Sequence, residues 1–263
     1  MKKIFFIIFL LTFYITCFGQ NSGPLKFLGI PIDGTEAQFV AKLKSKGFTY
    51  NTVYESYKGE FNGKPVDVYI HINHNLVDRI FVAFPYTTEE SIRVEFNRLL
   101  AQLKDTGKYM DLSMNEEIPV DDDISYEIIV NKKRYQAIFN YYDSDRDPVA
   151  FMNDLLDKFS DFFTEEQLTK LKEYAVKAMD VPKVQGEALQ VEMMAEMQKM
   201  GLGQDENAEP DPEKAFKFLT TFLNGMNSLA DGNVWFMIHE HYGRYQIGLY
   251  YDNLHNQAHG EDL

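Results

Sequence analysis

Residues 234–252, VWFMIHEHYGRYQIGLYYD, decide the fold that we expect for this chain. Two apolar runs flank the short polar segment at 241–243, which predicts a β-hairpin. Residues 124–143, ISYEIIVNKKRYQAIFNYYD, repeat much of this sequence, including Arg-Tyr-Gln and a closing Tyr-Tyr-Asp. We therefore expect a second hairpin there, with its turn at 131–133, and one sheet that contains both.

Upstream, three strand patterns follow one another at 53–61, 65–73 and 77–84. Asn62-Gly63 between the first two is a strong signal for a two-residue hairpin turn. In the second pattern, apolar residues alternate with Asp67, Tyr69 and His71. This period of two predicts a sheet with one dry face and one wet face.

Two helices are predicted beside these strands, one from Thr35 or Asp33 to Lys46 and one at 88–105, because both segments have apolar residues at helical spacing. We expect the second helix to cover the dry face. The fold class is therefore α+β: an antiparallel meander sheet with helices on one face and a helical insertion before a final β-hairpin.

Between the two related segments the hydrophobic period changes to that of helices, with expected helices at 148–162, 164–179, 185–200 and 212–229. A final hairpin alone is too small to fold independently, which favours an insertion into one sheet. The expected organisation is a signal peptide at 1–19, the first part of the sheet domain at 20–147, the insertion at 148–230, and the returning hairpin with a polar tail at 231–263.

The N-terminus has the pattern of a signal peptide. Lys2 and Lys3 precede an apolar run at 4–15, which is too short for a membrane span. Cleavage before Gln20 predicts an exported protein in the periplasm or outside the cell. Lipidation of Cys17 is the alternative, but its flanking residues Tyr14 and Thr16 fit that site poorly.

Cys17 is the only cysteine, so a protein cleaved before Gln20 has none and cannot use disulfides, thiol nucleophiles or cysteine-bound zinc. Loss of Lys2 and Lys3 lowers the basic count from 26 to 24 against 40 acidic residues, a net charge of −16. This charge disfavours nucleic acid and anionic membranes. It is compatible with a cation, a basic protein, a neutral envelope ligand such as a glycan, or a role in solubility alone. No later run is long enough for a transmembrane segment.

Three carboxylates at alternate positions, Asp143, Asp145 and Asp147, resemble a loop that binds calcium. The segment departs from the EF-hand pattern, because Pro148 stands where a turn glycine is needed and position twelve is Asp154. The alternative is structural: Asp147 caps the helix that begins at Pro148.

His239 and His241 are expected on one side of a strand, a spacing that suits a transition metal. The alternative is that both are solvated residues near the hairpin tip, since the first copy has Ile129 and Asn131 at these positions. The doublets at 141–142 and 250–251 predict one inward and one outward tyrosine each. Outward tyrosines suit a strip that binds a ligand or a partner. The alternative is structural: they are wide cross-strand neighbours that fill a twisted sheet.

The segment FLGIPIDGT at 27–35, together with YYDN at 250–253 and the ending GEDL, resembles exported proteins of unknown function that are common in Bacteroidetes. That resemblance implies export and no particular activity. The order of elements from 35 to 84 is similar to small modules of outer-membrane assembly and of β-lactamase inhibition, which bind proteins.

No nucleophile elbow, phosphate loop, dinucleotide fingerprint or zincin helix occurs in the sequence. We therefore expect an exported, non-catalytic protein that binds another protein or an envelope ligand through its sheet or its helical insertion. The rival hypothesis is a calcium- or metal-dependent hydrolase that uses the three aspartates or the histidines near the C-terminus, His239 and His241 first among them.

Overall fold

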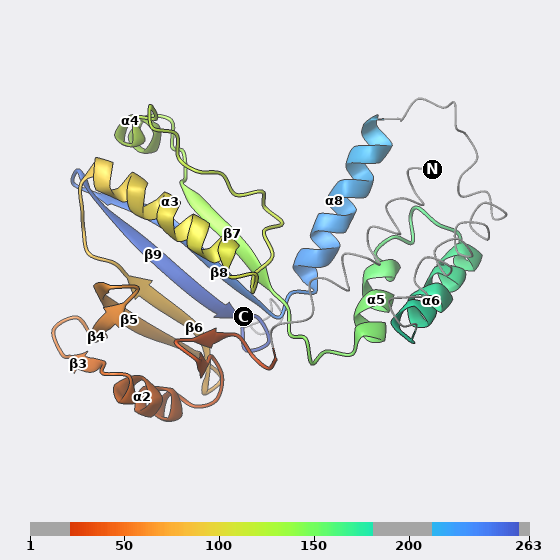
Figure 1. Ribbon diagram of the computed structural model, residues 1–263, viewed down its shortest axis with the longest axis horizontal. Helices are drawn as coiled ribbons and strands as arrows, with labels where there is room; N and C mark the ends of the chain where they lie inside the picture. The colour runs from red at the N-terminus through yellow and green to blue at the C-terminus, as the bar shows by residue number, and fades with distance from the viewer. Residues whose placement is uncertain (1–21, 181–211, 258–263) are drawn as a thin grey trace. The chain divides into compact units, whose positions relative to one another are not determined.

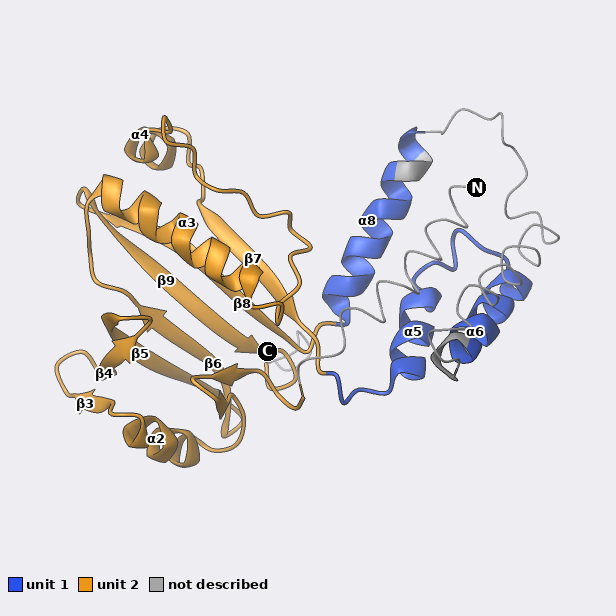
Figure 2. Cartoon of the chain, viewed as in Figure 1, with its two compact units in different colours: residues 1–21, 144–229 blue, residues 22–143, 230–263 orange. Residues whose placement is uncertain are grey.

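The computed structural model describes residues 22–180 and 212–257 (Figure 1). The expected signal peptide, Cys17 and the helix at 185–200 lie outside these residues. The chain divides into two compact units, one of residues 22–143 with 230–263 and the other of residues 1–21 with 144–229 (Figure 2). In the described parts of the chain, no helix is both long and apolar enough to cross a membrane.

The first of these units contains a seven-stranded antiparallel sheet, which confirms the predicted α+β class. Its strands in spatial order are β3 (Thr49–Asn51), β4 (Ser56–Phe61), β5 (Lys64–Asn73), β6 (Leu76–Ala83), β9 (Arg244–Asn253), β8 (Gly232–His241) and β7 (Gln136–Tyr141). A separate two-stranded ribbon joins β1 (Lys26–Phe27) and β2 (Ile30–Pro31). Asn62 and Gly63 both have positive φ, as the predicted turn between β4 and β5 requires.

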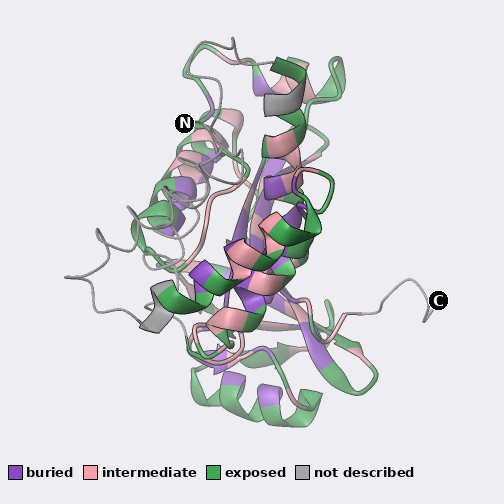
Figure 3. Ribbon diagram, turned by 90° about the vertical axis from the view of Figure 1, so that its right-hand side faces the viewer, coloured by how far each residue is buried: buried purple, intermediate pink, exposed green. Residues whose placement is uncertain are grey.

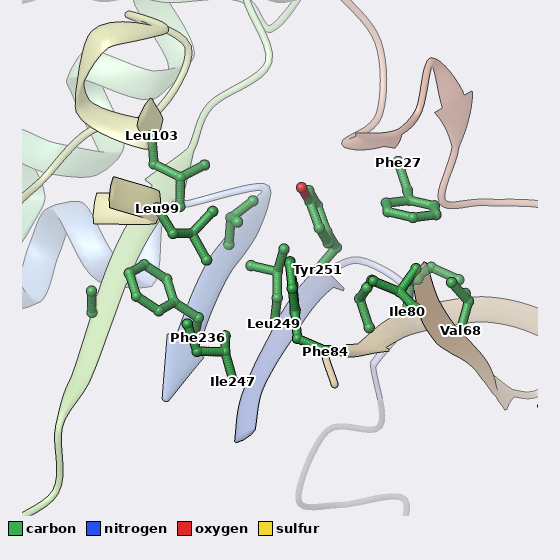
Figure 4. Packing of buried hydrophobic residues seen from close by; sticks show 14 of the residues in the cluster. Phe27, Val68, Ile80, Phe84, Leu99, Leu103, Phe236, Ile247, Leu249 and Tyr251 are labelled. Atoms are coloured by element: carbon green, nitrogen blue, oxygen red, sulfur yellow. The ribbon is translucent and has the colours of Figure 1, made fainter. Parts of the chain in front are cut away.

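Helices α2 (Glu36–Ser45) and α3 (Glu89–Asp105) pack on one face of the sheet. Thr35 caps α2 in a capping box, and Thr88 caps α3. Residues from both helices join the strands in one core, in which the rings of Phe96 and Phe236 lie 4.8 Å apart. Figure 4 shows Leu99 and Leu103 of α3 on the same side of the sheet as Phe236. Figure 3 shows the buried residues gathered along the strands and the inner sides of the helices.

The segment 124–133 corrects the prediction of a second hairpin, because its first half is a short helix, α4 (Ile124–Ile129). Asp123 caps α4 by accepting a hydrogen bond from the backbone of Tyr126 at 2.8 Å. A strand there would need the outer edge of β7, which is already occupied. Met110 forms a β-bridge with Asn140, and the side chain of Asn115 bonds both backbone groups of Ile138.

Only the second half of the repeated segment is a strand, and it does join the final hairpin. Strand β7 pairs with β8 along its whole length, from Gln136 opposite Met237 to Tyr141 opposite Gly232. One sheet therefore contains chain from both sides of the helical stretch. The turn between β8 and β9 is formed by Tyr242 and Gly243, both with positive φ.

The second unit contains helices α5 (Pro148–Asp157), α6 (Glu165–Asp180) and α8 (Pro212–Ser228). Thr164 and Gln167 form a capping box at the start of α6, with hydrogen bonds of 3.0 and 3.3 Å. The ring of Phe218 on α8 lies 4.8 Å from that of Phe159 just after α5. Helix α5 ends five residues before the predicted limit, in a turn.

Candidate functional site: the second face of the sheet

The sheet face opposite the core carries four aromatic side chains from four adjacent strands. Tyr69 lies opposite Phe81, Phe81 opposite Tyr250, and Tyr250 opposite Trp235, so all four share one row across β5, β6, β9 and β8. We call these residues the aromatic row. Each of them is partly exposed, whereas the neighbouring Val68, like most of the opposite face, is buried.

The rings of the aromatic row stack face to face. Tyr69 and Phe81 have ring centroids 5.5 Å apart, Phe81 and Tyr250 4.6 Å, and Tyr250 and Trp235 3.9 Å, with interplanar angles of 24°, 18° and 7°. Cross-strand aromatic pairs of this kind stabilise a sheet. Because the faces of the inner rings are covered by their neighbours, the ring edges are what the row presents outward.

A polar row of His71, Arg79 and Asp252 runs across β5, β6 and β9 beside the aromatic row. It holds the Trp235 side chain in place. Asp252 is 4% exposed and accepts hydrogen bonds from Arg79 at 2.5 and 3.0 Å and from the indole Nε1 of Trp235 at 2.8 Å. These bonds raise the pKa of Arg79 above its ordinary value. The guanidinium carbon also lies 6.0 Å from the Trp235 ring centroid and 5.9 Å from that of Tyr250.

A β-bulge ends this polar row on β5 and β6. The register shifts between His71 and Ile72, and Asp78 is the extra residue. The Asp78 carboxylate is almost fully buried and lies 2.6 Å from Nδ1 of His71. Ile72, expected on the dry face, is 36% exposed just beyond the bulge.

Gly248 on β9 lets two side chains of this face lie close to the backbone. A Cβ atom at this position would be 2.7 Å from Nε2 of His239 and 2.8 Å from the ring of Phe81. The same imidazole nitrogen is 3.2 Å from the Tyr250 hydroxyl. Burial lowers the pKa of His239 below its ordinary value. The side chains of His239 and Phe81 can therefore pack this closely only because residue 248 is a glycine.

Two of the three aspartates predicted for calcium make separate local hydrogen bonds in the structure. Asp143 accepts a hydrogen bond from the backbone of Gly23 at 2.9 Å. Asp145 is exposed. Asp147 caps α5, accepting from the backbone of Val149 at 2.9 Å, as in the structural alternative. Binding of calcium by these residues stays a prediction.

His239 and His241 both belong to β8 and point to the second face, but their surroundings differ. His241 is exposed and its ring lies 4.4 Å from that of Tyr242 at the turn, whereas His239 is half-buried beside Tyr250. Across residues 22–180 and 212–257, no three His, Cys, Asp or Glu side chains are arranged to hold a metal ion. A metal at these histidines stays a prediction.

The sequence places Tyr69 on the wet face and predicts that one tyrosine of the 250–251 doublet points outward, without indicating which; in the structure it is Tyr250. Sequence reasoning did not single out Phe81, Trp235 or Arg79. The alternation in β6 and β8 could have placed these three on the same face, but their lateral contacts depend on which strands are neighbours.

In comparisons with protein-family models, curated proteins and solved structures, nothing matches this chain. The class that the geometry supports is an α+β protein with an aromatic sheet face, and its role has to be argued from the site.

Proposed function

We propose that this chain is an exported, non-catalytic protein that binds another protein through the second face of its sheet. The observation that carries the proposal is the aromatic row: three successive stacked contacts on a partly exposed face, beside an ordered arginine. The carboxylates beside the row are engaged by Arg79, Trp235 and His71, which leaves the ring edges as the principal contact surface.

The residue types on this face are those that contribute most to protein binding. Tyrosine, tryptophan and arginine are enriched among residues whose truncation weakens complexes most. In this face their side chains are already held in place, Trp235 and Arg79 by Asp252 and Tyr250 by its two ring neighbours. Such pre-organisation lowers the entropy cost of binding.

A protein partner fits the row better than a glycan does. Sugars stack on exposed ring faces, but the faces of Phe81 and Tyr250 are covered on both sides by neighbouring rings. The chain has a formal net charge of −14, so association with a neutral or basic partner is favoured over association with an acidic one.

The test is to identify proteins captured from an envelope extract, purify the partner and measure its affinity for full-length variants. Trp235→Ala should weaken binding by tenfold or more, about 1.4 kcal/mol, as expected for a central interface residue. Trp235 is the only tryptophan, so its fluorescence reports binding at the site directly.

The matched control is Phe216→Ala, because Phe216 on α8 is an aromatic residue with 69% exposure in the helical unit. Binding that depends on Phe216 and not on Trp235 would place the partner on the helical unit. Catalytic turnover with no partner found would contradict the proposal altogether.

A further inference from the structure

A cavity of about 510 Å³ lies at one end of the sheet unit, where the β8–β9 turn meets the starts of α3 and α4. Its lining includes Tyr86, Thr87, Glu89, Ser125 and Arg244. Sites for small molecules usually have volumes of about 300–1,000 Å³. The cavity is separate from the aromatic row and from the function proposed for it.

The walls of the cavity are held by hydrogen bonds between segments that are distant in sequence. Thr87 and Tyr245 exchange two backbone hydrogen bonds of 2.7 and 3.0 Å, which extend the pairing of β9 beyond β6. The backbone of Gly243 donates to the Glu240 carboxylate at 2.7 Å and so fixes the turn. The site is thus built on paired backbone, which favours a preformed shape.

Arg244 provides the positive wall. Its Nη2 donates to the carbonyl oxygen of Tyr86 at 3.3 Å, and its guanidinium carbon lies 5.7 Å from the ring centroid of Tyr86. One nitrogen and one face of the guanidinium are thereby oriented. The remaining donors suit a carboxylate, which a guanidinium can bind with two parallel hydrogen bonds.

Glu89 provides the negative wall. One of its oxygens, Oε1, accepts a hydrogen bond from the backbone of Ile124 at 2.8 Å, which orients the carboxylate and ties α4 to α3. Although Glu89 and Arg244 line the same cavity, they do not form an ion pair with each other, and neither pairs with another charged residue that the structure describes.

We infer that this cavity binds a small zwitterion of the amino-acid type, such as an amino acid or a dipeptide with free termini. Arg244 binds its carboxylate and Glu89 its ammonium group, while the hydroxyls of Thr87 and Ser125 supply further polar contacts. The ring of Tyr86, which is 41% exposed, forms an apolar wall for a side chain. A simple anion would face Glu89 and a simple cation would face Arg244, so both are disfavoured.

The test is calorimetric titration of the full-length protein with alanyl-tyrosine in four forms: free, N-acetylated, C-amidated and blocked at both ends. The free dipeptide should bind saturably, and each blocking group should lower the affinity about tenfold or more, since each removes one charge-assisted contact. Equal binding of the blocked forms, or no binding of the free form at millimolar concentration, would overturn the inference.

Two variants test which end of the dipeptide each charged residue binds. Arg244→Met should remove the preference for a free carboxylate, and Glu89→Gln the preference for a free ammonium group. The matched controls are Arg134→Met and Glu90→Gln, which change exposed residues of the same types that do not line the cavity. Controls that weaken binding as much as the wall variants do would contradict the assignment, and the dipeptide series on the unmodified protein decides the inference if a variant does not fold.

Discussion

Gly248 is the residue on which the packing of the aromatic row depends most directly. Gly248→Ala would place a methyl group within 2.7 Å of His239 and 2.8 Å of Phe81, so both rings or the backbone have to shift. We expect a loss of about 1–3 kcal/mol in the free energy of unfolding, the usual cost of overpacking. Urea denaturation measures it.

The control for this prediction is a double-mutant cycle. In a Phe81→Ala background one of the two clashes is absent, so the cost of Gly248→Ala should fall by at least about 0.5 kcal/mol. Strictly additive effects would mean that the rings do not crowd position 248.

His239 makes the stability of the sheet unit sensitive to acid. Burial lowers its pKa in the folded protein below the ordinary value of 6.5. As the pH falls through 6.5 towards this lower value, the unfolded chain binds a proton that the folded chain does not, so stability decreases. His239→Asn should remove this part of the acid sensitivity. Denaturation curves over this pH range test it, and parallel pH dependence of the two proteins would refute it.

At the residue scale, the sequence predicts which face of the sheet a side chain is on. It does not predict which side chains on neighbouring strands it contacts. Alternation alone placed Tyr69 and His71 on the wet face, because side-chain direction depends only on parity along a strand. The prediction of one inward and one outward tyrosine is confirmed at 250–251, where Tyr251 is in the core and Tyr250 points outward. It is wrong at 141–142, where both tyrosines are buried. Contacts such as Trp235 with Tyr250 depend on register, which no single strand specifies.

At the element scale, helix starts were the most predictable features because their signals are local. Thr35, one of the two caps predicted for its helix, caps α2, and Thr164 begins α6 in a capping box with Gln167. The similar sequences of 124–143 and 234–252 led to the wrong prediction of a second hairpin, because a strand needs a neighbouring strand with a free edge. Residues 124–129 have none, since the segment around Asn115 occupies the outer edge of β7.

Asn115 gives a prediction at this scale. Its side chain donates to the Ile138 carbonyl oxygen at 2.8 Å and accepts from the Ile138 backbone nitrogen at 3.0 Å, so it replaces a strand at the edge of β7. Asn115→Ala should lower the free energy of unfolding by about 1–3 kcal/mol, because two part-buried backbone groups lose their partner. It should also promote self-association, because an unpaired edge can pair with another chain.

Light scattering and thermal denaturation measure the two effects of Asn115→Ala. Asn131→Ala is the matched control, since that amide makes an exposed hydrogen bond to the Glu127 carboxylate and contacts no strand through it. A monodisperse Asn115→Ala protein of unchanged stability would show that the edge is protected in another way.

At the scale of the whole molecule, the main difficulty for sequence reasoning is the distance along the chain between paired strands. Strand β9 pairs with β6, from Arg79 opposite Asp252 to Ala83 opposite Gly248, so the last strand of the chain lies in the middle of the sheet. The related sequences of 124–143 and 234–252 indicated that both segments belong to one sheet. They did not indicate that the hairpin would be inserted between β6 and β7, which creates the aromatic row.

This arrangement implies that the helical stretch 144–229 can be removed without loss of the sheet. Its two ends are held together within the sheet unit: the backbone of Asp231 donates to the Tyr141 carbonyl oxygen at 2.9 Å, and the backbone of Asp143 donates to the Asp231 carboxylate at 2.8 Å. Because the core on the helix-covered face of the sheet is formed by residues of that unit, a short Gly/Ser linker should replace 144–229 and leave a cooperative melt and unchanged Trp235 fluorescence. Deletion of 234–263 should instead abolish the melt, because it removes both strands between β6 and β7. If the linker protein melts without cooperativity, the sheet unit depends on the helices, and the insertion hypothesis is wrong.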